Sequence, residues 1–138
     1  MRYSALMLPI VLISCSNDFE NLPPEVLIQR LRDSDSKIHM KALRALSKPQ
    51  RTAFLVAQLN SEDKKIRGSC VHALTLIGDP RSIPEIAKLE HDPDRWVRRW
   101  VAFSMRQFDK DPMAETVKNR MKSDPDPSVQ SEARGDWF

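Results

Sequence analysis

The 138-residue sequence is poor in glycine, cysteine and histidine, and it has no long apolar run. Three glycines do not form a glycine-rich phosphate loop or a cofactor-binding fingerprint. The three histidines and two cysteines show no metal-ligand spacing on one helix face. No apolar stretch reaches the roughly 20 residues that a membrane-spanning helix needs. These absences argue against a metalloenzyme, a nucleotide-binding enzyme and a multi-span membrane protein.

What is present suits one folded domain of ordinary size. Charged residues make up 30% of the chain and hydrophobic residues 41%. The formal net charge of +3 is too small an excess to indicate a nucleic-acid-binding protein, although it favours acidic partners. Ten prolines lie mostly between apolar stretches, which predicts helices separated by proline-containing turns.

The first fifteen residues have the pattern of an export signal. Arg2 is followed by a continuous apolar run from Ala5 to Ile13, and the chain turns polar after Cys15. The residues Leu12-Ile13-Ser14-Cys15 resemble the lipobox of bacterial lipoproteins. A buried N-terminal helix is the alternative, but such a helix would carry polar residues at helical spacing, and this run has none.

The lipoprotein resemblance implies a fate for each part of the N-terminus. Residues 1–14 would be a cleaved signal peptide, Cys15 would carry acyl chains, and residues 15–21 would be a short tether. Ser16 in the position after the cysteine resembles an outer-membrane sorting signal, so we expect a lipid anchor in the outer membrane, facing the periplasm. Two or three acyl chains are enough for stable anchoring. Cys70 would then be unpaired, and we expect it to be buried.

The rest of the chain repeats one motif four times. Each copy contains an aliphatic anchor residue, and the four anchors are Ile38, Ile66, Val97 and Val129. An aspartate precedes each anchor by three residues: Asp35, Asp63, Asp94 and Asp126. Apolar or small residues follow the anchors by four positions, at Ala42, Cys70, Val101 and Ala133, and by eight, at Leu46, Leu74, Met105 and Trp137.

This spacing predicts a helix in each copy. The aspartate caps the helix start, and the residues at intervals of four form one apolar stripe. A shorter amphipathic segment precedes each motif, with proline near its start where proline is tolerated. Each copy is therefore a helix–turn–helix unit. Such units bury their apolar faces only by stacking, which predicts an all-α protein: an α-solenoid of about four repeats over residues 22–138.

The motif resembles HEAT repeats, particularly the short kind named after phycobilisome lyases, over about residues 22–135. Asp92-Pro-Asp-Arg-Trp-Val97-Arg98 carries the resemblance. In that family an aspartate and an arginine six residues later form a ladder between repeats. Asp92 and Arg98 keep that pair, whereas the other copies have Ser61 with Arg67, Asp33 with His39, and Asp124 with Gln130. The resemblance therefore implies an incomplete ladder.

No nucleophile motif or cofactor fingerprint is present, so we expect no catalytic residues, metal or cofactor. Some similar repeat proteins attach bilins or accompany hydroxylases with His-Glu motifs, but this chain has no His-Glu dipeptide. The favoured hypothesis is a membrane-anchored, non-catalytic scaffold that binds a protein or peptide, with an acidic partner as one candidate. It would bind neither nucleic acid nor a small-molecule substrate. The alternative is an accessory or lyase-like enzyme component that binds a chromophore or cofactor.

One shoulder of the third repeat is the predicted binding surface. Trp96, Trp100 and Phe103 fall on the same side of their helix, beside the core stripe. Arg95, Arg99 and Arg106 are expected to face water. The positions equivalent to the three rings also look solvent-facing in the other repeats, where they are Lys37, Lys41 and Arg44; Lys65, Ser69 and His72; and Ser128, Glu132 and Gly135. A widened core is the alternative interpretation. The predicted protein-binding strip consists of Trp96, Trp100, Phe103, Lys37, Lys41, Arg44 and Lys65.

Overall fold

The computed structural model describes residues 18–136, and this part of the chain is helical throughout, without strands. It contains eight α-helices and three short 3-10 helices. The helices are α1 (Pro24–Arg30), α2 (Ser36–Leu46), α3 (Thr52–Gln58), α4 (Lys64–Ile77), α5 (Ile83–Ala87), α6 (Arg95–Gln107), α7 (Pro112–Met121) and α8 (Pro127–Arg134). The 3-10 helices are η1 (Asp18–Asn21), η2 (Pro49–Arg51) and η3 (Pro80–Ser82).

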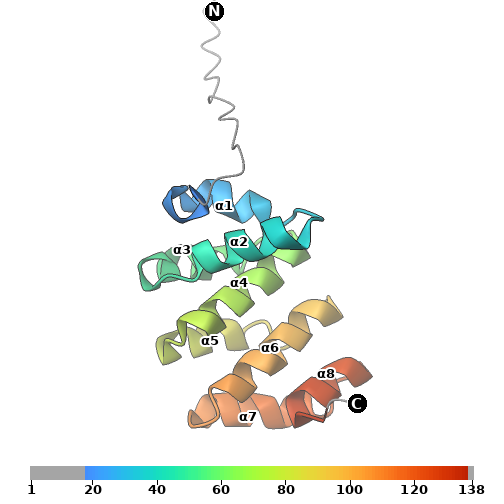
Figure 1. The fold of residues 1–138 in the computed structure, drawn as a ribbon. Coiled ribbons are helices and arrows are strands. Elements are labelled where there is room, and N and C mark those ends of the chain that lie inside the picture. Colours follow the sequence, from blue (N-terminus) through green and yellow to red (C-terminus); the bar gives the residue numbers. More distant parts are fainter. Residues whose placement is uncertain (1–17, 137–138) are drawn as a thin grey trace, which may run out of the picture.

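The helices form four successive pairs stacked along one axis (Figure 1). The second helices of the pairs, α2, α4, α6 and α8, form one layer, and α4, α6 and α8 pack in sequence against one another. The first helices support this layer, with α1 on α2, α3 on α4 and α7 on both α6 and α8. The predicted all-α solenoid of four helix–turn–helix repeats is confirmed. Within the described residues, no helix is long and apolar enough to cross a bilayer.

Aspartate side chains begin all four second helices, as predicted. The carboxylates of Asp35, Asp63, Asp94 and Asp126 each accept a hydrogen bond from the backbone N–H two residues ahead. These bonds, 2.8–2.9 Å long, satisfy N–H groups that lack a partner within the helix. The ends of two of these helices are also determined by nearby residues. Gly78 ends α4 and Gly135 ends α8, both in the left-handed conformation, at φ values of +74° and +78°.

The anchor stripe forms the core. Val97, Val101 and Met105 are fully buried on α6, and Cys70 is buried on α4 as expected. Ile38 differs from the other anchors because it is only half-buried. Its helix, α2, is the first of the layer and has a second-helix neighbour on one side only, so less surface is available to cover it.

The folded part begins before the predicted domain boundary at residue 22. Residues 18–21, which the sequence analysis assigns to the tether, form η1, and Phe19 packs against the core. The predicted signal peptide (residues 1–14), Cys15 and Trp137 lie outside the described residues.

Candidate functional site: an aromatic groove across the second helices

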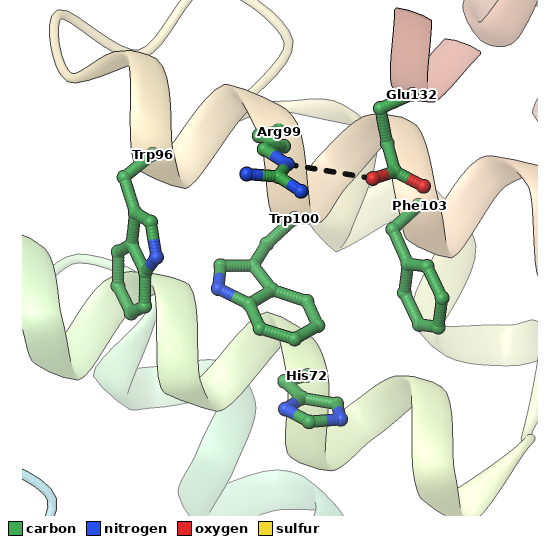
Figure 2. Close-up of a pocket in the computed structure, with 6 residues that line it drawn as sticks. All are labelled: His72, Trp96, Arg99, Trp100, Phe103 and Glu132. Atoms are coloured by element: carbon green, nitrogen blue, oxygen red, sulfur yellow. Dashed lines mark hydrogen bonds and ion pairs between the residues drawn. The ribbon is translucent and has the colours of Figure 1, made fainter. Parts of the chain in front are cut away.

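A groove of about 330 Å³ lies where α4, α6 and α8 meet. We call it the aromatic groove, and its lining residues are His72, Trp96, Arg99, Trp100, Phe103 and Glu132. Figure 2 shows the three aromatic rings of α6 directed toward α4, where His72 faces Trp100. Arg99 points instead toward Glu132 of α8, to which a dashed line connects it. The third repeat therefore supplies three rings, Trp96, Trp100 and Phe103, which we call the aromatic wall. The second repeat adds His72 and the fourth adds Glu132.

The local sequence of α6 sets the aromatic wall. Asp94 starts the helix by accepting a hydrogen bond from the Trp96 N–H, and helical spacing then places Trp100 and Phe103 on the same side as Trp96. Trp100 is central, with ring centroids 6.1 Å from Trp96 and 5.5 Å from Phe103, both edge-to-face. Such arrangements are favourable for aromatic pairs. All three rings are half-buried, so each keeps some surface open to a ligand.

A glycine on α4 makes room for the first of these rings. A Cβ atom built on Gly68 would lie 2.3 Å from an atom of the Trp96 ring, far inside van der Waals contact. Gly68 therefore lets the indole lie directly on the α4 backbone.

His72 forms the floor of the groove opposite Trp100. The two rings stack with centroids 4.0 Å apart and planes 18° from parallel. Burial lowers the pKa of His72, the charge of nearby His39 contributes a smaller part in the same direction, and together they bring the pKa to about 4. His72 is therefore neutral at pH 7, where it acts as a flat aromatic surface rather than as a cation.

Glu132 is the acidic residue of the groove, and its side chain is only 3% exposed. It pairs with two guanidinium groups of α6: Arg106 at 3.2 Å and Arg99 at 3.5 Å. Burial raises the pKa of Glu132, while the two arginines act in the opposite direction. Arg106 also donates to the Glu132 backbone carbonyl, at 3.2 Å. These contacts tie α8 to α6 and hold the Arg99 side chain at the groove edge.

The predicted solvent exposure of this shoulder is wrong in part. Ser69 and Glu132 are buried and His72 is half-buried, although all three positions were expected to face solvent. Arg99 and Arg106 are also turned toward α8 rather than fully into water. The reason is that consecutive second helices cross each other, so the shoulder of one helix is covered by its neighbour. The sequence does contain a signal for this burial. Glu132 is the single acidic residue of α8, and α6 in the preceding repeat carries four arginines with which it could pair.

The structure brings some of the predicted strip together and separates the rest. Lys65 shares a second cavity with Trp96. Lys41 and Arg44 line a different hollow with Phe19, over whose ring the Lys41 ammonium lies at 5.9 Å. Lys37 is exposed on α2. Protein binding by the strip residues, Trp96, Trp100, Phe103, Lys37, Lys41, Arg44 and Lys65, stays a prediction.

The ladder between repeats is incomplete, as the resemblance implies. Arg67 forms a bidentate salt bridge with Asp92 of the next repeat, with N–O distances of 2.8 and 2.9 Å. Arg98 forms the equivalent bidentate salt bridge with Asp124, at 2.8 and 3.2 Å. The equivalent His39 contacts the carbonyl of Leu31 instead. The rungs therefore join the second, third and fourth repeats, the same repeats that build the aromatic groove. Across residues 18–136, no cluster of His, Cys, Asp and Glu could hold a metal ion.

Comparison with known proteins identifies the family. The family model described as HEAT repeats matches residues 52–135, which is more than half of the chain. The chain therefore belongs to the HEAT repeat family. The crystal structure of the Escherichia coli protein YibA is similar in fold, with a TM-score of 0.56 at 20% sequence identity. The similarity covers 87% of this chain but only 46% of YibA, so this chain spans about half the length of that protein. No curated protein sequence matches the chain.

Proposed function

We propose that this protein is a membrane-anchored, non-catalytic module that binds another protein through the aromatic groove. The observation that carries the proposal is the groove itself, in which half-buried Trp96, Trp100 and Phe103 lie beside Arg99. Tryptophan and arginine are the residues most enriched at the energetic centres of protein interfaces. A HEAT array supports such a surface because stacked repeats provide a long rigid platform.

The anchor is proposed from the sequence. Leu12-Ile13-Ser14-Cys15 follows an apolar run of the length found in export signals, and Cys15 is the residue to be acylated. Lipidation would hold the helical array close to the bilayer surface, in the periplasm and on the outer membrane. The groove would then meet partners that lie at or near that membrane.

Replacing Cys15 tests the anchor. We expect Cys15→Ala to abolish metabolic labelling with a fatty acid and to move the protein out of the lipid-anchored fraction, because no other thiol is placed for acylation. Cys70→Ala is the matched control, since Cys70 is fully buried on α4 and its loss leaves the labelling unchanged. Unlabelled wild-type protein in a soluble fraction would overturn the proposed localisation.

Site-specific crosslinking in native membranes tests the binding role. A photoreactive phenylalanine analogue at Phe103 should form a discrete crosslinked protein adduct, because this ring lines the groove. The same analogue at Met113, which is 47% exposed on α7 in the other helix layer, should form none. Adducts of equal yield from both positions, or none from Phe103, would contradict the proposal. Visible absorbance from a bound chromophore on the purified protein would favour an accessory or lyase-like component instead.

A further inference from the structure

A second cavity, of about 380 Å³, lies beside the aromatic groove. The residues that line this second cavity are Leu31, Asp33, His39, Lys64, Lys65 and Trp96. Trp96 lines both spaces, so the two adjoin at its ring. One runs from α6 toward α8, and the other from α6 toward α2. Together they follow the second-helix layer across all four repeats, a shape suited to an extended segment of chain.

The charges of this layer are segregated. Helices α2, α4 and α6 contain no Asp or Glu, and α8 contains only Glu132. The same four helices carry eleven Lys and Arg residues. In contrast, the first helices α1, α5 and α7 each carry a glutamate: Glu25, Glu85 and Glu115. The layer that holds the groove is therefore basic, although the whole chain is only +3.

Internal pairing neutralises part of this charge, and cations with exposed side chains lie beside both cavities as well as on α2. Helix-starting aspartates and ladder carboxylates pair with four of the eleven cations: Lys64, Arg67, Arg95 and Arg98. Arg99 and Arg106 both pair with Glu132 of α8. The Arg99 side chain lines the aromatic groove and is 43% exposed, and the exposed Lys65 lines the second cavity together with Trp96. Each of the two cavities therefore has an exposed cation in its lining.

We propose that the occupant is an extended acidic segment of a partner protein that carries one aromatic or bulky aliphatic side chain. The apolar side chain packs among Trp96, Trp100 and Phe103, and flanking carboxylates pair with Arg99 and Lys65. This inference rests on the proposed binding role and names the chemistry of the partner. Nucleic acid and anionic lipid share the negative charge, but the concave apolar walls beside the cations fit a side chain that a phosphate backbone or a flat bilayer lacks.

A set of four labelled pentapeptides tests the inference on the full-length chain in a mild detergent. The acidic aromatic peptide is Asp-Glu-Phe-Asp-Glu. Its comparisons replace Phe by Ala, the acids by Ser, or the acids by Lys and Arg. By fluorescence anisotropy, the acidic aromatic peptide should bind about tenfold more tightly than each comparison, and its affinity should fall as salt is added. A preference for the basic peptide, or equal affinity with and without Phe, overturns the inference.

Two variants of α6 separate the groove from general electrostatics. Arg99→Gln should weaken binding of the acidic aromatic peptide roughly fivefold, because a charge-assisted hydrogen bond is lost. Arg95→Gln removes the same charge from the same helix, but Arg95 is 75% exposed and faces Asp126 outside the groove, so binding should be unchanged. Equal losses in the two variants contradict the inference. The peptide comparison needs no variant and therefore holds even if a substitution perturbs folding.

The other anionic ligands are controls in the same assay. Displacement of the peptide by duplex DNA, or by phosphatidylglycerol vesicles but not phosphatidylcholine vesicles, would overturn the assignment to an acidic protein segment. Failure here is distinct from failure of the binding role. If Phe103 crosslinks to a protein in membranes and the acidic aromatic peptide does not bind, the role stands and the proposed partner chemistry is wrong.

Discussion

Val97→Asp should unfold the array or lower its free energy of unfolding by about 4 kcal/mol, a large share of a domain's total. Val97 is fully buried on α6, one helical turn before the equally buried Val101. An aspartate there would place an unpaired charge in an apolar environment or be forced to take up a proton. Thermal melting followed by circular dichroism measures the effect.

The same substitution at an exposed valine is the control. Val26 is 39% exposed in the first turn of α1, where an acidic side chain interacts favourably with the helix N-terminus. Val26→Asp should therefore leave the melting temperature nearly unchanged. Equal melting temperatures for the two variants would show that the helical register of the third repeat is wrong.

Arg67→Ala is expected to have the second-largest effect, a loss of about 3 kcal/mol. Arg67 bridges the second and third repeats by its pair with Asp92, whose side chain is 3% exposed. Arg67 also donates to the backbone carbonyls of Ser61 and Glu62, at 2.9 and 3.0 Å. Its removal leaves a buried carboxylate without its guanidinium partner and frees two turn carbonyls. Chemical denaturation of the variant measures the loss.

An exposed pair between other repeats provides the comparison. Arg32 pairs with Asp63 at 2.9 Å, but the two side chains are 58% and 27% exposed, so water screens the interaction. Arg32→Ala should cost no more than about 1 kcal/mol. A double-mutant cycle on Arg67 and Asp92 isolates the pairwise energy. A coupling near zero, or equal losses for Arg32 and Arg67, would mean that the ladder does not stabilise the stacking.

Much of the fold could be predicted because its signals are local. Asp94 caps α6 through a bond to the N–H of Trp96, two residues ahead, and Gly78 ends α4 through its own backbone conformation. The recurrence of anchors every 28 to 32 residues then indicates stacked repeats, since each helix pair exposes apolar surface on both sides. The aromatic wall of the site was also predictable, because Trp96, Trp100 and Phe103 belong to a single helix.

The rest of the site could not be predicted, because its partners come from different helices. Trp96 lies over Gly68, Trp100 stacks on His72, and Arg99 reaches Glu132. Each of these contacts depends on how far one helix is shifted along its neighbour. If equivalent positions of the four repeats lined up in a single exposed stripe, Glu132 would face solvent. In the structure Glu132 is buried, because the neighbouring helix covers it.

By itself, the sequence determined the helices, their caps, the core stripe and the repeat architecture, since capping bonds and helical periodicity act within a few residues. Only the tertiary structure decided which side chains of adjacent repeats meet. That choice depends on the crossing and axial offset of α4, α6 and α8, which the small Gly68 and the buried Glu132 pairs help to set. No local pattern encodes that offset, because it follows from the packing of side chains on separate helices.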